Sequence, residues 1–337
     1  MNRIKKHPLF LLLTLMLLSM FITETSYSQT ANRKLAQTSF KFLTISLDAR
    51  AASMADAMTA QEATSTALFY NPASMAWMED RISVGLGMTQ WIADVNYNSA
   101  SAAFRTPFGV FGVSGTMVDY GDFLGTIRAD NDDGFIDTQT YSPTAMAFGL
   151  GYARALTARF SVGAQVKYVA QDLGSAPLRY DDNENLVYEG YDQNAMAFDF
   201  GVFYDTGFNG MKLAMAFRNF SRELTYVEEN FELPLQFRIG LSMDLINLTQ
   251  INPATHSLLL SIDTERPRDY FEQVKVGAEY TFLNTFAIRG GVIAPHDEQG
   301  VNLGFGIKDL AGFDLDYSYT DFGIFDGVNR FSLKFGF

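Results

Sequence analysis

Few side chains in this sequence could carry out chemistry. It has no cysteine and only three histidines, His7, His256 and His296, which lie far apart along the chain. The lack of cysteine removes thiolate metal sites, cysteine nucleophiles, disulfides and lipid attachment at an N-terminal cysteine. Because no motif places a nucleophile beside a base, the sequence predicts no catalytic residue, no cofactor and no metal centre. We therefore do not expect an enzyme.

Carboxylates instead gather in two long segments, of which 121–140 is the first. It contains Asp130 and, directly after it, the stretch NDDGFID with Asp132 and Asp133, which resembles a calcium loop. With Gly134 at the sixth position, the first and twelfth ligands would be alanine and threonine, so a twelve-residue calcium loop is excluded. The segment is predicted to be a solvated acidic loop, with a loose divalent-cation site as the alternative. Its Asp130, Asp132 and Asp133 are also candidate partner-binding residues.

The second acidic segment, 172–193, also carries tyrosines. Its candidate partner-binding residues are Tyr180, Asp181, Asp182, Tyr188 and Tyr191. Aromatic side chains are enriched at protein interfaces, which favours a docking patch. A surface loop kept soluble by its charge explains the composition equally well.

The charge balance and the start of the chain restrict the class of protein. The net charge of −13 argues against binding to nucleic acid, which needs a basic surface. Residues 1–28 combine a basic start, an apolar stretch at 9–22 and small residues before Gln29. This pattern predicts a secretory signal peptide, since the apolar stretch is too short to span a membrane as a helix.

From residue 81 onward, apolar and polar residues alternate with the period of a β-strand. In residues 273–282, one face holds valine, alanine, tyrosine and phenylalanine, while the other holds Gln273, Lys275, Gly277, Glu279 and Thr281. A soluble β-sandwich would also alternate. However, the apolar faces are rich in aromatic residues, the other faces carry charge, and the segments are as long as tilted membrane strands. These features favour a transmembrane barrel.

Fourteen such segments make up a predicted barrel domain, 81–337, although twelve or sixteen remain possible. They are 81–91, 97–105, 109–120, 141–154, 157–171, 194–206, 210–220, 232–247, 252–264, 270–283, 285–294, 300–308, 311–321 and 329–337. Connections after even-numbered strands are tight, whereas several after odd-numbered strands are long. Outer-membrane barrels have short periplasmic turns and long extracellular loops. The sequence thus predicts a bacterial outer-membrane protein with its long loops extracellular.

The polar face of these strands predicts a charged lumen. The expected inward-facing charges are Lys167, Asp199, Arg218, Arg238, Asp244, Lys275, Glu279, Arg289, Asp314, Asp316, Arg330 and Lys334. The last strand alternates up to a terminal Phe337, as expected for a strand that closes a barrel against its first strand.

Residues 29–80, ahead of the strands, are apolar but irregular. A short helix is expected near Asp48, and a second helical stretch is broken at Pro72. Irregular backbone at membrane depth must be buried in protein or line a cavity, so this segment is predicted to be a hatch inside the barrel. Arg50 in this hatch is expected to pair with Asp314 and Asp316 on the inner wall of the barrel.

Two stretches of the predicted hatch resemble a known family. LDARAASMADAMTA at 47–60 and ALFYNPASMAWM at 67–78 are similar to the N-terminal signature of the PorV/PorQ proteins, which belong to a wider group similar to the fatty-acid transporter FadL. TQWIADVNY at 89–97 also resembles this family. The resemblance implies an all-β, 14-stranded antiparallel transmembrane barrel, with a hatch of short helices in its lumen and Asn71, Pro72 and Ala73 at the core of that hatch.

The resemblance leaves two functions open. The first is a role in type IX protein secretion, in which the chain binds or shuttles cargo proteins through their C-terminal domains, alongside other secretion-system components. The second is FadL-like transport of hydrophobic small molecules across the outer membrane. Outer-membrane lipid is the expected surrounding in both cases. The charged lumen favours secretion, because a transporter is expected to have a continuous apolar pocket.

Overall fold

The computed structural model describes residues 38–61, 64–180, 186–226, 229–296 and 299–337. The predicted signal peptide, 1–28, and the first part of the predicted hatch, 29–37, lie outside the described residues. Within the described part of the chain, no helix combines the length and the apolar character needed to cross a membrane.

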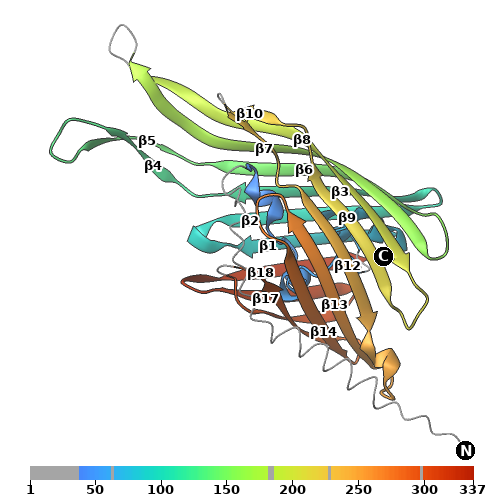
Figure 1. Ribbon diagram of the computed structural model, residues 1–337. Helices are drawn as coiled ribbons and strands as arrows, with labels where there is room; N and C mark the ends of the chain where they lie inside the picture. Colours follow the sequence, from blue (N-terminus) through green and yellow to red (C-terminus); the bar gives the residue numbers. More distant parts are fainter. Residues whose placement is uncertain (1–37, 62–63, 181–185, 227–228, 297–298) are drawn as a thin grey trace, which may run out of the picture. The chain divides into compact units, whose positions relative to one another are not determined.

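Fourteen antiparallel strands close into one barrel, which confirms the predicted fold class (Figure 1). Each strand pairs with the next one around the ring, and the order around the ring follows the chain. The strands are β1 (Ile82–Gln90), β2 (Asn96–Thr106), β3 (Gly109–Asp119), β6 (Thr144–Ala155), β7 (Phe160–Tyr180), β8 (Leu186–Asp205), β9 (Lys212–Phe220), β12 (Gln236–Asp244), β13 (His256–Pro267), β14 (Gln273–Phe282), β15 (Phe286–Ala294), β16 (Asn302–Leu310), β17 (Phe313–Phe322) and β18 (Phe325–Gly336).

The barrel closes between β1 and β18, which pair from Ser83 opposite Gly336 to Gln90 opposite Asn329. The terminal residue takes part in this closure. The Ile82 N–H donates to the carbonyl oxygen of Phe337 at 2.8 Å, and the Phe337 N–H donates back at 3.0 Å. Lipid offers no hydrogen bonds to an open strand edge, so this last pair completes a ring without edges.

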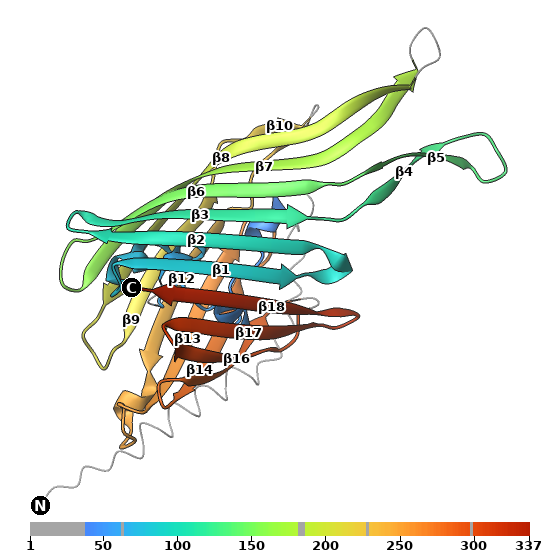
Figure 2. The same cartoon turned by 180° about the vertical axis from the view of Figure 1, so that it is seen from behind.

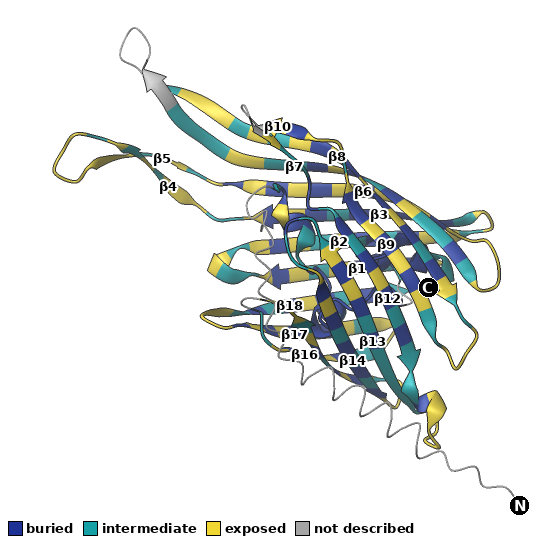
Figure 3. Cartoon of the chain, viewed as in Figure 1, coloured by how far each residue is buried: buried dark blue, intermediate teal, exposed yellow. Residues whose placement is uncertain are grey.

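The two faces of the strands differ as the alternation predicts (Figure 3). Large apolar side chains such as Leu150 and Phe305 are exposed on the outer surface. Ten of the twelve charges predicted to face inward are buried, namely Lys167, Asp199, Arg218, Arg238, Lys275, Glu279, Arg289, Asp316, Arg330 and Lys334. Asp244 and Asp314 are half-buried, since each lies next to a turn at one end of the barrel.

The two ends of the barrel have different connections. One end, here called the short-turn end, carries tight turns such as 107–108 and the helix η5 (Leu245–Leu248). The other, the long-loop end, carries η4 (Ile92–Asp94) and the long connections, for which the alternation pattern predicts loops. The structure folds them into hairpins: β4 (Phe123–Arg128) with β5 (Phe135–Tyr141), β10 (Leu224–Tyr226) with β11 (Glu229–Phe231), and the outer parts of β7 and β8.

Two of these hairpins, β4–β5 and β7–β8, project well beyond the other strands in both views (Figure 2). Strands β7 and β8 run for 21 and 20 residues, about twice the length of their neighbours. They remain paired as they leave the barrel, so the long-loop end presents extended ribbons and not only flexible turns.

A run of short helices occupies the lumen, as the predicted hatch requires. The helices are η1 (Lys41–Thr44), α2 (Ala49–Ser53), η2 (Ser65–Phe69) and η3 (Pro72–Trp77). A helix begins near Asp48 as expected, and the Asp48 side chain caps it by accepting from the N–H groups of Arg50 and Ala51. Pro72 was predicted to break a helix, and in the structure it is also the first residue of η3. A proline is tolerated there because the N–H it lacks would have no partner within the helix.

Glycines on the inner wall mark where the hatch backbone touches the strands. A methyl group at Gly163 on β7 would lie 2.5 Å from the amide nitrogen of Ala73. One at Gly291 on β15 would lie 2.6 Å from the carbonyl carbon of Met54, and one at Gly304 on β16 would lie 2.5 Å from Cβ of Ser53. No side chain fits at these points, so glycine lets the hatch lie directly against the wall.

We expect Gly163→Ala to destabilise the barrel by about 1–3 kcal/mol, because the new methyl group collides with backbone that cannot move aside. The measurement is the temperature at which the folded band of detergent-solubilised protein is lost on electrophoresis. The control is Gly115→Ala on β3, whose methyl group would meet only the Phe148 ring, at 3.5 Å. Equal melting temperatures for the two variants would contradict the close contact between hatch and wall.

Candidate functional site

The Asn71–Pro72–Ala73 motif ties the hatch to two strands. The Asn71 amide is fully buried and donates to the carbonyl oxygens of Thr59 at 2.9 Å and Val202 at 3.2 Å. Its side-chain oxygen accepts from the Ala73 N–H at 3.1 Å and so caps η3. The Ala73 carbonyl in turn accepts from the Ser161 hydroxyl on β7 at 2.8 Å. The motif thus joins two parts of the hatch to β7 and β8.

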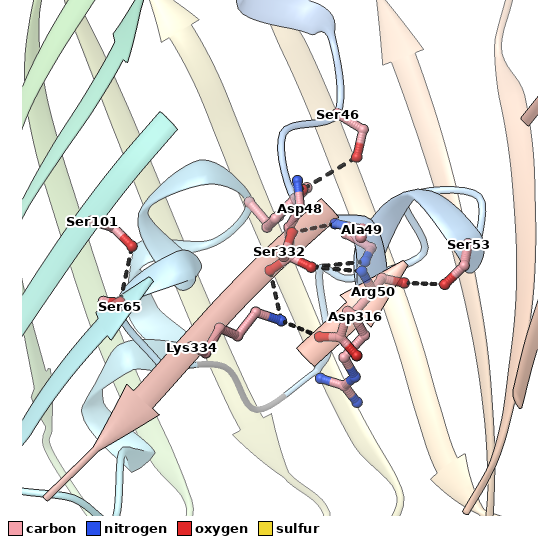
Figure 4. Close-up of polar contacts among 12 residues, drawn as sticks. Ser46, Asp48, Ala49, Arg50, Ser53, Ser65, Ser101, Asp316, Ser332 and Lys334 are labelled. Carbon is pink, nitrogen blue, oxygen red and sulfur yellow. Dashed lines mark hydrogen bonds and ion pairs between the residues drawn. The ribbon is translucent and has the colours of Figure 1, made fainter. Parts of the chain in front are cut away.

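The start of α2 is fixed to β18 by both charge and hydrogen bonding (Figure 4). The Asp48 carboxylate, which caps the helix, also pairs with Nζ of Lys334 at 2.7 Å. The N–H of Ala49 donates to the Ser332 hydroxyl at 2.8 Å. Lys334 reaches Asp316 on β17 as well, at 3.2 Å. Helix α2 is therefore held by the C-terminal strand that closes the barrel.

The predicted partner of Arg50 was wrong. Its guanidinium donates to Glu279 on β14, with Nε to Oε2 at 2.8 Å and Nη2 to Oε1 at 3.2 Å. Two parallel bonds of this kind are the strongest form of arginine–carboxylate pairing. Asp316 pairs instead with Arg289 and Lys334. The Asp314 carboxylate accepts a hydrogen bond from the backbone N–H of Asp309.

Charges of opposite sign lie close together along the wall, which explains this outcome. Glu279 lies opposite Arg289 in the register of β14 and β15, and the two pair at 2.5 Å. Arg289 also pairs with Asp316 at 2.7 Å, and Lys308 pairs with Glu279 at 2.9 Å. These wall pairs already neutralise Asp316, so Arg50 completes the network at Glu279. Buried charges arranged in this way compensate each other's loss of hydration.

A cavity of about 500 Å³ lies at the long-loop end, between the hatch and strands β12 to β18. Its lining includes Trp91 and Phe322 near the loops, and the side chains of Asp56, Lys275 and Arg330. None of its lining residues belongs to the turns of the short-turn end. At that end, apolar residues of the hatch pack against the wall, as Met75 and Leu68 do against Val110 and Ala153.

The described start of the hatch is tied to the rim of this cavity. Asp269, between β13 and β14, accepts from the Thr38 hydroxyl at 2.8 Å and from Nζ of Lys41 at 2.7 Å. Burial alone would raise the pKa of the Asp269 carboxyl, but the hydrogen bonds from Lys41 and Thr38 outweigh it and lower this pKa. The carboxylate therefore stays charged and holds the chain at the rim.

The candidate docking residues lie on the projecting hairpins. Asp130, Asp132 and Asp133 are exposed between β4 and β5, and Tyr188 and Tyr191 belong to β8. Asp181, Asp182 and the side chain of Tyr180 lie outside the described residues. The described residues contain no group of three histidine or carboxylate side chains placed to hold a metal ion.

Two residues of the cavity were not picked out by sequence reasoning. Arg330 was expected only as one inward charge among twelve, and Asp56 only as part of a small-residue stretch. The stretch TQWIADVNY could have pointed to this cavity, because its Trp91 lies there. The Arg330 guanidinium carbon is 5.4 Å from the centroid of the Trp91 ring.

A model of the family described as type IX secretion system protein PorV matches residues 28–262, more than half of the chain. The chain belongs to the PorV family. The PorV family consists of non-enzymatic outer-membrane barrels that belong to the type IX secretion system. No curated protein matches the chain.

Solved structures show the same fold at low sequence identity. The monoaromatic hydrocarbon channel CymD has a TM-score of 0.59 at 13% identity, covering 86% of this chain and 97% of CymD. The Pseudomonas putida toluene transporter TodX gives 0.57 at 12%, covering 84% and 95%. A Pseudomonas aeruginosa FadL homologue gives 0.53 at 14%, covering 86% and 98%. This PorV-family chain therefore has a FadL-like fold and is an outer-membrane β-barrel.

We expect Glu279→Gln to destabilise the barrel by about 3–5 kcal/mol, because it removes the carboxylate shared by Arg50, Arg289 and Lys308, of which, among the described residues, only Arg289 keeps a second carboxylate partner. Thermal unfolding in detergent micelles measures the effect. The control is Glu272→Gln, which removes the exposed pair with Arg266 and is expected to cost about 0–1 kcal/mol. Equal stability of the two variants would show that the hatch is not held by this network.

Proposed function

We propose that this protein holds secreted cargo proteins at the outer membrane, through the surface at its long-loop end. The observation that carries the proposal is the contrast between the two ends. The hatch is bound into the barrel by buried ion pairs, while paired hairpins extend from the long-loop end. We further propose that this end faces the cell exterior, where cargo is released.

The fixed hatch supports holding over conduction. To open a path, the hatch would have to leave Glu279, Lys334 and the glycine contacts together, exposing several unpaired charges to a narrow lumen. Removing one partner of a buried pair costs about 3–5 kcal/mol, so breaking several at once requires a large compensating interaction. A protein that serves as a docking platform needs no such movement.

The hairpin β4–β5 offers the chemistry of a protein-binding surface. Its large apolar side chains Phe123, Leu124, Phe135 and Ile136 are 46–58% exposed. The acidic residues at its tip lie beside them. An exposed apolar patch with a charged rim is the usual composition of an interface core and its surround. We assign the C-terminal domains of cargo, together with other secretion-system components, as the partners of this surface.

One observation favours transport as a second candidate function. The FadL-like fold is combined with a cavity of about 500 Å³, within the size range of small-molecule sites. Against a hydrocarbon-like ligand, the lining includes the charged side chains of Glu265, Lys275 and Arg330. Binding an apolar ligand against charged side chains contributes little favourable free energy, because the charged groups lose their hydration without gaining a hydrogen-bond or ion-pair partner.

Affinity purification from native outer membranes tests the proposal. We expect the double variant Leu124→Ser and Ile136→Ser to recover about tenfold less cargo than the unaltered protein, since truncating central interface residues costs more than 1 kcal/mol each. The matched control is Phe108→Ser with Leu156→Ser, which removes two side chains of similar exposure at the short-turn end. Full cargo recovery by the hairpin variant would refute this surface, and co-purified lipid without any protein partner would support transport.

A further inference from the structure

Arg330 is a buried cation whose charge is not paired directly. Its side chain is 2% exposed and lines the cavity at the long-loop end. Nε donates to the carbonyl oxygen of Ser46 at 3.1 Å, and Nη1 donates to the Thr320 hydroxyl at 2.9 Å. Both acceptors are neutral. Among the described residues, no carboxylate lies within the 4.0 Å of an ion pair, and Nη2 has no acceptor.

Asp56 is the corresponding unpaired anion on the hatch side of the same cavity. It is 9% exposed, makes no ion pair within 4.0 Å in the described chain, and its Oδ1 has no hydrogen-bond partner there. Its backbone is left-handed, with φ of 60°, directly after Ala55 with φ of 56°. Aspartate is one of the few L-residues that adopt this conformation readily, so its side chain suits this turn of the hatch.

These two charges differ from the others around the cavity. Glu265 pairs with Lys275, and Asp269 pairs with Lys41, so these four groups neutralise one another. Asp56 and Arg330 both line the cavity, yet they do not form an ion pair with each other within 4.0 Å. Among the described residues, Arg330 and Asp56 are therefore a cation and an anion of the cavity that lie beyond ion-pair distance of each other and lack direct charged partners.

The rest of the lining supplies apolar surface near these charges. The Trp91 ring lies over the Arg330 guanidinium, and Phe322 packs edge-on against Trp91 with ring centroids 4.9 Å apart. Ile45 of the hatch and Ile293 of β15 add aliphatic surface. An apolar pocket with a few convergent polar groups is the usual form of a small-molecule site.

We propose that this cavity binds a small zwitterion with an apolar body, of the class of short apolar peptides. The carboxylate would pair with Arg330, the ammonium group would pair with Asp56, and the apolar side chains would pack against Trp91 and Phe322. A hydrocarbon would leave both charges unpaired, and a fatty acid would leave Asp56 unpaired. The size of the cavity, about 500 Å³, suits a dipeptide or tripeptide. The inference goes beyond cargo holding and does not depend on it.

The two tryptophans of the chain, Trp77 and Trp91, provide the measurement. In the Trp77→Phe background the remaining indole is at the cavity, so its fluorescence in detergent micelles reports binding. The probe is the dipeptide leucyl-phenylalanine, compared with its N-acetylated, C-amidated and doubly capped forms. We expect the free dipeptide to bind about tenfold more tightly than either singly capped form, one charge pair being lost in each. The doubly capped form should show no saturable binding.

Two variants assign each end of the ligand. Asp56→Asn keeps a residue that tolerates the left-handed backbone and should abolish only the preference for a free ammonium group. Arg330→Gln should abolish only the preference for a free carboxylate. The control is Arg154→Gln, an exposed arginine of β6 near the short-turn end, which should leave both preferences intact.

Three results would overturn the inference. They are equal affinity for free and doubly capped dipeptide, the absence of saturable binding at millimolar concentration, and tighter binding of a long-chain fatty acid than of the dipeptide. Because the preferences are ratios measured within one variant, a general loss of stability would not mimic the expected pattern.

Discussion

The structure depends on one constraint, which is that charges enclosed by a barrel must find partners inside it. Ion-pair energies rise where bulk water is excluded, and so does the cost of an unpaired charge. The wall offers Glu279, Arg289, Asp316 and Lys334 on β14, β15, β17 and β18, and these charges alternate in sign across the strands. The hatch adds Asp48 and Arg50, one of each sign, at the two ends of this row.

The shape of the lumen follows from the same requirement. For Asp48 and Arg50 to reach the wall, α2 must lie against it, and this is where glycines replace side chains on β15 and β16. The apolar helix η3 then fills the other half of the lumen, where Met75 packs against β3 and β6. The short-turn end is occupied by this packing, and the remaining space lies at the long-loop end.

Much of the fold could be predicted from sequence because strand alternation is a local pattern. Lipid on one side and a polar lumen on the other impose a period of two on every strand, so fourteen strands were predicted without knowing which strands pair. The start of α2 near Asp48 was similarly local, because a cap depends on residues two or three positions away, whereas the cap that Asn71 provides for η3 was not predicted. The projecting hairpins were missed, because pairing beyond the membrane has no lipid-facing side and so leaves a weaker pattern.

The contacts of the site could not be predicted in the same way. Arg50 had several carboxylates available in the lumen, and its choice of Glu279 depends on the register of β14 against β15 and on the cations already bound to Asp316. Asp56 and Arg330 lie 274 positions apart and line the same cavity only because of the position of the hatch in the barrel. Sequence reasoning identified the residue types but not these distances.

The likeness to hydrocarbon channels and the membership of a secretion family are compatible, because a fold hosts a function through the chemistry of its sites. What this chain shares with them is the fold, and in this chain that fold provides an edgeless ring with a cavity at one end. In this chain the barrel encloses ion-paired side chains, and both cationic and anionic side chains line the cavity. Charges of both signs discriminate against hydrocarbons and favour ligands that carry charge themselves. A barrel built in this way is suited to recognising peptides and proteins, with its hatch serving as a fixed support.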